Sequence, residues 1–453
     1  MQPLPKEFEE QMKRLLGEAG FFAYLDALNQ PYARALRVNL LLRPDGTPPC
    51  PIEGLGAPVP WAKGAYFVEG DARPGLSPLH EGGLFYMQEP SALTAVTALD
   101  PQPGERVLDL CAAPGGKSTQ IAALMAGRGL LCCNEPIPSR AQILSRNIER
   151  MGVRNAVVLS AMPDALAPRF PAFFDRILVD APCSGEGMFR RQPEARDEWD
   201  ADAPRRCADR QMEILAQAAK MLRPGGTMVY STCTFNDTEN KGVLKRFLAL
   251  HPEFSLVPFA LPGLPEAKDG YLHLYPHEMR GEGHFVSRLK KADGADEADA
   301  PVQAAPQRKA PARAAAKGKA PAPIILPDVF SDAFAPERLY TAGDALWMLP
   351  EGISIERLSG LRVLRTGLLL AHAEGKRSEP DHALAMALRP EEAARTASLT
   401  QTQALAYQAG ETLSLGDLPG GYTLLCCEGV SLGWGKQAGG LMKNHYPKGL
   451  RRR

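Results

Sequence analysis

Short apolar segments alternate with amphipathic segments along residues 76–290, and this alternation constrains the fold more than any other feature. The apolar segments are rich in Leu and β-branched residues, and the segments between them have helical periodicity. Strands that alternate with helices are typical of a parallel sheet covered by helices on both faces. We therefore predict a doubly wound α/β domain over residues 76–290. The expected strands are 106–110, 129–134, 156–160, 176–180 and 227–231, with a final antiparallel edge strand at 284–291.

The regions that flank this domain have different patterns. Residues 1–75 begin with an amphipathic helical segment and continue with strand-like segments, which predicts a small α+β unit. Residues 291–323 are rich in Ala, Pro and Lys and nearly lack large apolar side chains. Because such a composition cannot build a core, we expect a flexible linker there. Two further small units are expected at 324–395 and 396–453.

Composition excludes several classes of protein. The nine cysteines are an odd number and are scattered, which does not suit a disulfide framework and favours a reducing cytoplasm. The chain has no apolar signal region and no apolar run long enough to cross a bilayer, so we expect no membrane association. It also lacks C-x-x-C and H-E-x-x-H, so no metal site is expected. Since the net charge is zero, nucleic-acid binding would have to come from local basic patches.

A glycine-rich turn, DLCAAPGGKS, joins the first expected strand to a helix. Such a turn lets the backbone approach a ligand and leaves N–H groups free to bind it. A phosphate-binding loop would need Gly at position 111, where Cys111 stands, and the dinucleotide pattern GxGxxG is absent. Asp109 and Glu135 each end an expected strand and could meet an ammonium group and ribose hydroxyls. Together these features favour S-adenosyl-L-methionine, whereas either carboxylate alone could be a helix cap or a surface acid.

Two thiols, Cys183 and Cys233, also follow expected strands, and Asp180 precedes the first of them. A thiolate can act as a nucleophile, and a neighbouring carboxylate can assist the same reaction. The spacing by itself does not tell which thiol would be the nucleophile. The remaining cysteines that the sequence places in apolar or helical segments are interpreted as small buried hydrophobic residues: Cys132, Cys133, Cys207, Cys426 and Cys427.

The motifs DLCAAPGGKS, NEP, DAPCSGEGMFRR and YSTCTFNDTEN, in this order, resemble the Sun-type RNA (cytosine-5) methyltransferases over about residues 20–290. RALRVN and FYMQEPSA resemble the N-terminal signatures of that family. The C-terminal GWGKQAGGLMKNHYPKGLR resembles the bacterial RsmF-type ribosomal RNA methyltransferases. The resemblance implies a Rossmann-like class I methyltransferase core, an RNA-binding N-terminal unit, and small C-terminal RNA-binding domains of which the last is PUA-like.

The resemblance also implies roles for single residues. Cys233 matches the nucleophile that adds to carbon 6 of cytosine, Cys183 matches the thiol that helps to release the methylated product, and Asp180 is expected to act beside them. Asp164 lies slightly later than the position that faces the adenine in many relatives. The residues expected to bind S-adenosyl-L-methionine are Asp109, Cys111, Ala112, Ala113, Pro114, Gly115, Gly116, Lys117, Glu135, Asp164 and Asp180.

The C-terminal segment 433–453 carries six Lys or Arg residues and no acid, which predicts contact with RNA phosphates. The expected RNA contacts are Lys436, Lys443, Tyr446, Lys448 and Arg190. We expect a cytoplasmic monomer that methylates ribosomal RNA, most readily 16S RNA, alone or in the small ribosomal subunit. The same chemistry on transfer RNA and a non-catalytic ribosome-assembly factor are the alternatives. The intact set Asp180, Cys183 and Cys233 favours an enzyme over the latter.

Overall fold

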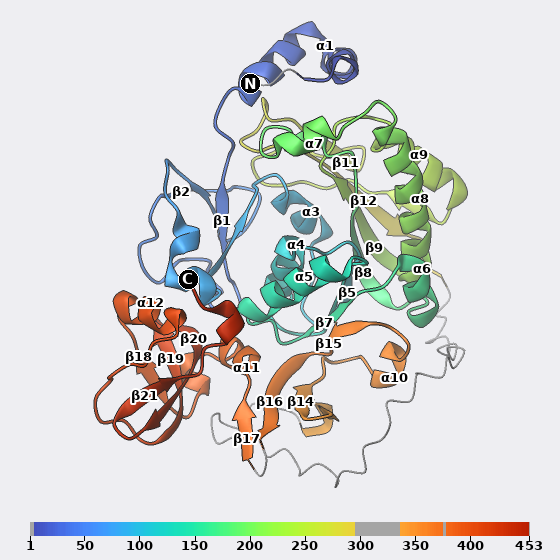
Figure 1. The fold of residues 1–453 in the computed structure, drawn as a ribbon. Coiled ribbons are helices and arrows are strands. Elements are labelled where there is room, and N and C mark those ends of the chain that lie inside the picture. The colour runs from blue at the N-terminus through green and yellow to red at the C-terminus, as the bar shows by residue number, and fades with distance from the viewer. Residues whose placement is uncertain (1–3, 295–335, 375–376, 453) are drawn as a thin grey trace.

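A computed structural model describes residues 4–294, 336–374 and 377–452 (Figure 1). Its centre is a nine-stranded sheet with the order β10-β12-β9-β8-β5-β6-β7-β15, to which β11 adds by pairing with β12. The strands of this sheet that precede residue 295 are β5 (Arg106–Asp109), β6 (Leu130–Asn134), β7 (Ala156–Leu159), β8 (Phe174–Asp180), β9 (Leu222–Thr232), β10 (Phe254–Leu256), β11 (Tyr271–Leu274) and β12 (His284–Lys291). The predicted doubly wound α/β core is confirmed.

Strands β5 to β9 are mutually parallel, in the spatial order β9-β8-β5-β6-β7. The antiparallel strand predicted at 284–291 forms as β12, but it does not lie at the edge of the sheet. It lies between β9 on one side and β10 and β11 on the other. The sequence missed this because β10 and β11 are only three and four residues long and lack a clear strand pattern.

Helices cover both faces of the sheet, and adjacent side chains of each strand point to opposite faces. Cys132 packs in the cluster that holds α6, α8 and α9, whereas Cys133 packs in the cluster that holds α3, α4 and α5; both are fully buried. This confirms that the two cysteines are core residues. The helices are α3 (Leu93–Leu99), α4 (Gly116–Leu124), α5 (Pro138–Arg150), α6 (Pro163–Leu166), α7 (Pro193–Asp197), α8 (Ala203–Met221) and α9 (Lys241–Leu250).

The N-terminal unit has a four-stranded sheet of order β2-β3-β1-β4 and a helix, α1, that lies apart from that sheet (Figure 1). Phe8 of α1 is fully buried, and its ring lies 4.9 Å from the ring of Phe189 and 5.8 Å from that of Trp199. The helix therefore packs on the segment that follows β8. The elements are α1 (Lys6–Leu28), β1 (Ala35–Val38), β2 (Leu55–Pro58), β3 (Ala65–Val68), α2 (Pro78–Glu81) and β4 (Phe85–Gln88).

The C-terminal region forms two four-stranded sheets, β13-β14-β16-β17 and β18-β19-β20-β21, and also contributes to the central sheet. Strand β15 pairs antiparallel with β7 and covers its free edge. The predicted linker 291–323 lies outside the described residues from residue 295 on. The elements are β13 (Leu339–Ala342), β14 (Ala345–Met348), α10 (Ile355–Leu358), β15 (Val363–Arg365), β16 (Leu368–Glu374), β17 (Arg377–Pro380), α11 (His382–Ala387), β18 (Thr396–Ser398), α12 (Gln401–Ala409), β19 (Gly421–Cys427), β20 (Val430–Ala438) and β21 (Leu441–Asn444).

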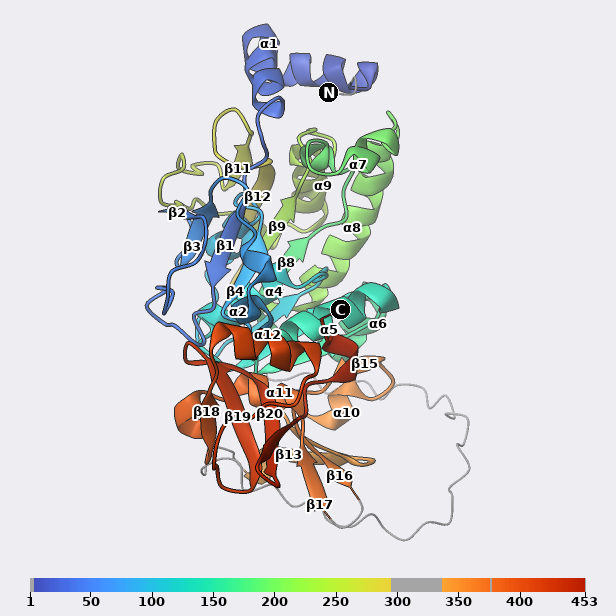
Figure 2. The ribbon, with the colours of Figure 1, turned by 60° about the vertical axis from the view of Figure 1, so that its left-hand side comes forward.

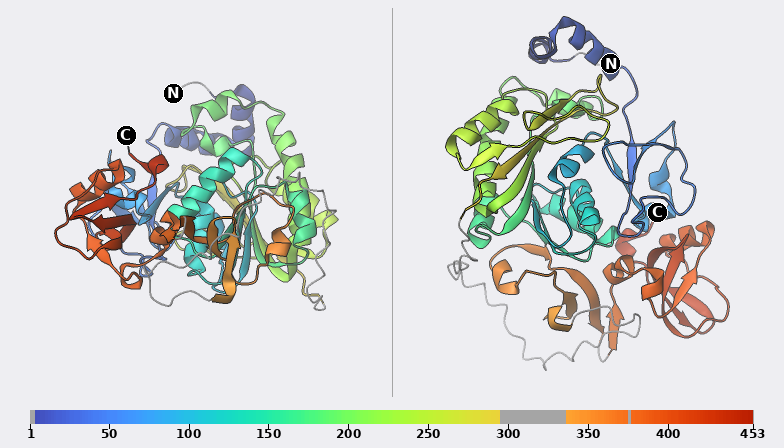
Figure 3. Two further views of the ribbon diagram at one scale, coloured as in Figure 1. Left: turned by 60° about the horizontal axis from the view of Figure 1, so that its bottom comes forward. Right: turned by 180° about the vertical axis from the view of Figure 1, so that it is seen from behind.

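The last of these sheets packs against the N-terminal unit, although the two are at opposite ends of the chain (Figures 2 and 3). Their apolar side chains share one buried cluster that contains Leu36 and Phe85 from one unit and Tyr407 and Leu432 from the other. The side chain of Gln408 donates to the carbonyl of Pro78 at 3.0 Å. The C-terminal region is thus an integral part of the molecule. No helix of the described residues is long and apolar enough to span a bilayer.

An ion pair ties the β15 segment to α5. The guanidinium of Arg365, whose side chain is 4% exposed, contacts the carboxylate of Glu149. Removing one member of a buried pair leaves a buried charge without compensation.

Glu149→Ala is expected to lower the free energy of unfolding by about 3 kcal/mol, because the charge of Arg365 would remain buried and unpaired. Urea denaturation measures this change. Asp200→Ala is the matched control, since it breaks the exposed Arg206–Asp200 pair and should leave the free energy of unfolding nearly unchanged. Equal losses in the two variants would show that the Arg365 pair does not hold the two regions together.

Candidate active site

Polar side chains collect where the parallel strands end. Asp109 ends β5, Glu135 follows β6, Asp180 ends β8 and Cys233 follows β9. The register pairs Asp180 with Ser231, so the ends of β8 and β9 lie side by side. Ligands of open α/β sheets bind at this edge. The structure therefore brings together the strand-end residues that the sequence singled out.

The glycine-rich loop after β5 is held from α5. Gly115 directly precedes α4 and has a φ of 113°, a conformation that favours glycine. The Nδ2 of Asn147 donates to the carbonyl of Pro114 at 2.8 Å, and the guanidinium of Arg140 donates to that of Ala113 at 3.1 Å. The loop is thereby fixed with the N–H groups of the first turn of α4 available to a ligand.

Asp109 lies beneath this loop and is fully buried. Its Oδ2 accepts a hydrogen bond from Ser118 Oγ at 2.6 Å, whereas its Oδ1 has no partner among the described residues. Burial raises the pKa of Asp109 to about 7. A buried carboxylate oxygen without a donor is costly, which indicates that a ligand group completes its environment.

Glu135 is 3% exposed at the end of β6. Its Oε1 accepts from the backbone N–H of Ile137 at 3.0 Å, and its Oε2 lies 3.6 Å from a guanidinium nitrogen of Arg140. Asp164 lies after β7 at the start of α6, is exposed, and accepts from the N–H of Ala165 at 2.9 Å. Glu135 is thus held in place by the protein, while the carboxylate of Asp164 faces solvent.

Asp180 is the centre of a charged cluster. Its Oδ2 accepts from Lys117 Nζ at 2.8 Å, its Oδ1 accepts from Ser231 Oγ at 2.8 Å, and His284 Nε2 lies 3.5 Å from Oδ1. Burial opposes ionisation, but the Lys117 ammonium and His284 outweigh it and lower the pKa of Asp180. Burial likewise disfavours the charge of Lys117, but Asp180 and, more weakly, Cys233 raise its pKa. Asp180 is therefore ionised at neutral pH.

The two thiols predicted from the sequence are neighbours, since Cys183 Sγ lies 3.2 Å from Cys233 Sγ. Both are free and partly exposed. The hydrogen bond to Cys233, together with burial, raises the pKa of Cys183 well above its ordinary value. The backbone N–H of Gly187 donates to the carbonyl of Cys233 at 2.8 Å and joins the two loops. Cys183 therefore keeps its proton at neutral pH.

Two buried carboxylates, Glu239 and Glu186, clamp these loops together. Glu239 comes from the Cys233 side and accepts hydrogen bonds from the N–H of Ser184 at 3.0 Å, from the Ser184 hydroxyl, and from Gln211 Nε2 at 2.8 Å. Asn236 Nδ2 also donates to it at 2.8 Å. Burial raises the pKa of Glu239.

Glu186 comes from the Cys183 side and makes the reciprocal contact. Its Oε2 accepts from the N–H groups of Phe235 and Asn236 at 2.8 and 3.0 Å, and its Oε1 accepts from Gln11 Nε2 of α1 at 2.9 Å. Sequence reasoning missed both carboxylates. They stand inside the motifs GEG and TEN, but nothing in a linear pattern shows that each crosses to the other loop.

Three of the predicted RNA contacts have different surroundings from those expected. All five N–H groups of Arg190 are used inside the protein, on Glu282 and on the carbonyls of Ala27, Gln30 and Gly281. We therefore do not propose Arg190 as an RNA contact.

Tyr446 is 4% exposed and packs against Tyr407 and His382, so its ring cannot stack on a base. Lys436 lies opposite Lys443 on the β20–β21 hairpin, and its ammonium is 4.6 Å from the ring centroid of Tyr422. Lys443 and Lys448 are exposed. Fewer residues of the last domain are therefore available to contact RNA than the sequence suggested.

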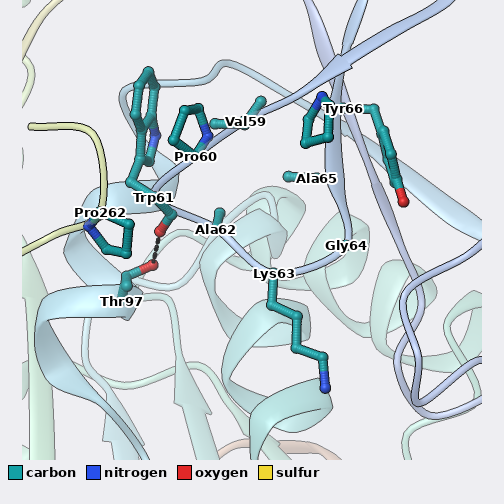
Figure 4. A pocket seen from close by; sticks show the side chains of 11 residues that line it. Val59, Pro60, Trp61, Ala62, Lys63, Gly64, Ala65, Tyr66, Thr97 and Pro262 are labelled. Atoms are coloured by element: carbon teal, nitrogen blue, oxygen red, sulfur yellow. Dashed lines mark hydrogen bonds between the residues drawn. The ribbon is translucent and has the colours of Figure 1, made fainter.

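Hollows elsewhere on the molecule differ from this site in their chemistry. One of about 420 Å³ lies between the segment 58–66, Thr97 and Pro262, and its lining contains neither a thiol nor a carboxylate (Figure 4). A larger one of about 900 Å³ lies between the end of α1, the segment 68–73 and the loop 276–281. No group of three or more His, Cys, Asp or Glu side chains within the described ranges could hold a metal ion.

Glu239→Ala is expected to lower the free energy of unfolding by about 3–5 kcal/mol, since it leaves several buried donors without an acceptor. Urea denaturation checks this value. Asp237→Ala is the matched control in the same loop, because Asp237 is half exposed and should contribute less than about 1 kcal/mol. Alkylation of Cys183 and Cys233 by iodoacetamide should also become faster in Glu239→Ala alone. Unchanged stability and alkylation would contradict the clamp.

Comparison with known proteins identifies each part of the chain. Residues 96–290 match the family described as 16S rRNA methyltransferase RsmB/F, and residues 4–90 match the N-terminal domain of 16S rRNA methyltransferase RsmF. Residues 328–388 match the first C-terminal domain of RsmF rRNA methyltransferase, and residues 394–452 match the methyltransferase RsmF PUA domain.

Similar proteins and structures agree with these matches. A methyltransferase homolog from Pyrococcus horikoshii is 30% identical with a TM-score of 0.53, covering 63% of this chain and 95% of its own. NSun6 from the same organism, determined with SFG, shares the fold at 23% identity and a TM-score of 0.55, covering 64% of this chain and 99% of its own.

Ribosomal RNA small subunit methyltransferase F of Erwinia tasmaniensis is 33% identical over 98% of this chain and 96% of its own length. The Klebsiella pneumoniae protein of that name is 34% identical over 98% of this chain and 96% of its own length. With all four domain matches in order and similarity along nearly the whole chain, this protein belongs to the RsmF group of the RsmB/F family of 16S rRNA methyltransferases.

Proposed function

We propose that this rRNA methyltransferase transfers a methyl group from S-adenosyl-L-methionine to carbon 5 of a cytosine in 16S rRNA, through a covalent bond between Cys233 and carbon 6. The observation that carries the proposal is the pair of thiols 3.2 Å apart beside the Lys117–Asp180 ion pair. Methyl transfer alone would not need two thiols at one strand edge. A covalent reaction has a use for both, because one bond to the base must form and later break.

The residues at the ends of β5 and β6 fit S-adenosyl-L-methionine. The unpartnered Oδ1 of buried Asp109 suits an ammonium group, and Glu135 suits ribose hydroxyls. The loop 111–117 and the first turn of α4 would hold the methionine part. When bound there, the cofactor supplies an electrophilic methyl group. Asp164, exposed at the start of α6, is the proposed contact near the adenine.

We assign the role of nucleophile to Cys233, the thiol that matches the family's nucleophile. The raised pKa of Cys183 keeps its proton on sulfur, so it can donate a hydrogen bond to a thiolate on Cys233. The nearby Lys117 ammonium also stabilises negative charge at Cys233. Addition of that thiolate to carbon 6 moves an electron pair toward carbon 5, which then becomes nucleophilic enough to take the methyl group.

Asp180 acts in its ionised form. Lys117 and His284 lower the pKa of Asp180 against the effect of burial, so we do not assign it the role of an acid that protonates the ring. As a carboxylate it accepts hydrogen bonds from the exocyclic amino group of cytosine and from a protonated N3. It therefore orients the base and stabilises positive charge on the ring during addition.

Cys183 serves the release step. The proton on carbon 5 passes to water, the double bond between carbons 5 and 6 re-forms, and the electron pair of the carbon–sulfur bond returns to Cys233. The S–H of Cys183 stabilises the departing thiolate by a hydrogen bond. This division of roles follows the family resemblance, in which Cys233 matches the nucleophile and Cys183 matches the thiol that helps to release the product.

The substrate is proposed to be 16S rRNA, free or in the small ribosomal subunit, bound by a monomer in the cytoplasm. The target base must leave its stack to reach the thiols. Exposed Lys443 and Lys448 would hold phosphates of the RNA. Arg73, which lines the 900 Å³ hollow together with exposed Tyr32, would hold a further phosphate. Transfer RNA is the alternative substrate. A non-catalytic assembly factor would have no use for the thiol pair.

The roles of the thiols predict opposite behaviour of two variants. Cys233→Ala should form no covalent RNA complex and no 5-methylcytosine, because the nucleophile is absent. Cys183→Ala should stall at release and retain RNA as a shifted band in denaturing electrophoresis. The double variant, which lacks the attachment point, is the control and should show no band. A stable complex in Cys233→Ala but not in Cys183→Ala would reverse the assignment.

The raised pKa of Asp109 predicts pH-dependent cofactor binding. A protonated, neutral Asp109 cannot pair with an ammonium group, so affinity should fall as the pH drops below about 7, by up to about tenfold per pH unit. Calorimetry with S-adenosyl-L-methionine near pH 6 and pH 7.5 measures this. Asp109→Asn is the control, and its affinity should be low and nearly independent of pH. A flat profile in the unaltered protein would place the ammonium elsewhere.

A further inference from the structure

Arg37 of strand β1 is a buried cation without an anionic partner. Its residue is 1% exposed, and no carboxylate of the described residues forms an ion pair with it. Burial lowers the pKa of Arg37 to about 10, so the guanidinium is still charged at neutral pH. A buried charge without an ionic partner lowers the stability of the fold, so packing alone does not explain why an arginine stands here.

The guanidinium of Arg37 reaches out of the N-terminal unit to the start of α4. Its Nη2 donates to Thr119 Oγ1 at 2.8 Å and to the carbonyl of Gly116 at 3.3 Å. Thr119 Oγ1 in turn donates to the carbonyl of Gly116 at 3.1 Å. Gly116 is also in tight contact with β4, since a Cβ there would lie 3.2 Å from the ring of Tyr86. The turn that begins α4 is thus supported from behind by strands of a different domain.

Asn39 extends the same support. It directly follows β1, two residues beyond Arg37. Its Nδ2 donates to the carbonyls of Gly83 at 2.9 Å and Met151, at the end of α5, at 3.0 Å. Since α5 holds the other side of the glycine-rich loop through Asn147, the R-x-N pair fixes both helices that flank it.

We propose that Arg37 is a positioning residue of the cofactor site, through which the N-terminal domain fixes the α4 turn and adds positive charge behind it, where the carboxylate of the methionine part binds. The proposal rests on the function proposed above. Both the N-terminus of a helix and a buried guanidinium favour a negative group at this place. Arg37 does not touch the cofactor itself, because its donors face Gly116 and Thr119.

Calorimetry on the full-length protein with two different ligands tests this proposal. S-Adenosylhomocysteine carries the amino-acid part, whereas methylthioadenosine lacks it and keeps the nucleoside. Arg37→Gln should weaken the binding of S-adenosylhomocysteine about tenfold, a loss of the size expected when one hydrogen bond with a charged group is removed. The binding of methylthioadenosine should weaken less than about twofold. Arg37→Lys keeps the charge and should recover most of the affinity.

Two further variants make the result specific. Arg34→Gln is the matched control, since Arg34 lies on the same segment but donates to the carbonyls of Gly70 and Ala72 within the N-terminal unit. It should leave both affinities unchanged. Thr119→Val removes the hydroxyl that accepts from Arg37 Nη2, and its effect should not add to that of Arg37→Gln if the two act through this contact.

The outcomes separate the possible failures. Equal weakening of both ligands by Arg37→Gln, with no recovery in Arg37→Lys, would reduce Arg37 to a packing residue and overturn the proposal. Unchanged affinity for S-adenosylhomocysteine would overturn it as well. If the unaltered protein bound neither ligand, the proposed cofactor itself would be wrong, and that result is independent of Arg37.

Discussion

The parallel hydrogen-bonded register of β6, β5, β8 and β9 is the constraint on which the site depends. It brings the ends of these strands to one edge, so that residues far apart in the chain, such as Asp109 and Asp180, become neighbours. A slip of one residue in any strand would turn its side chains to the opposite face. Apolar side chains on the two faces of these strands fill two separate cores, which opposes such a slip.

Charge at this edge is controlled by the partners of each carboxylate. Desolvation opposes the ionisation of both Asp109 and Asp180, yet the pKa of Asp109 is raised and that of Asp180 is lowered. The difference comes from Lys117, which pairs with Asp180 at 2.8 Å and leaves one oxygen of Asp109 without a donor. One carboxylate is thereby held as an anion, and the other keeps an oxygen that has no partner among the described residues.

The flanking domains complete the core. Strand β15, from beyond residue 335, covers the edge of β7, and α1 supplies Gln11 to the clamp between the two cysteine loops. Arg37 connects the N-terminal sheet to the start of α4. The last domain in turn shares its apolar cluster with the N-terminal sheet. An RNA that binds the terminal domains would therefore contact domains that also support the strand ends where the candidate active site lies.

The sequence by itself determined the parallel core, the glycine-rich turn and the position of Cys183 and Cys233 just after two strands, because these depend on local periodicity, strand ends and short motifs. The PUA-like last domain could also be predicted from its C-terminal motif. Patterns along the chain could not show that β12 is interior, that Glu186 and Glu239 clamp opposite loops, or that Arg190 and Tyr446 are engaged within the protein. Those properties depend on which distant residues become neighbours and on which groups lose contact with water. Only the tertiary structure decides them, since burial and partner choice set the charge and the availability of a side chain.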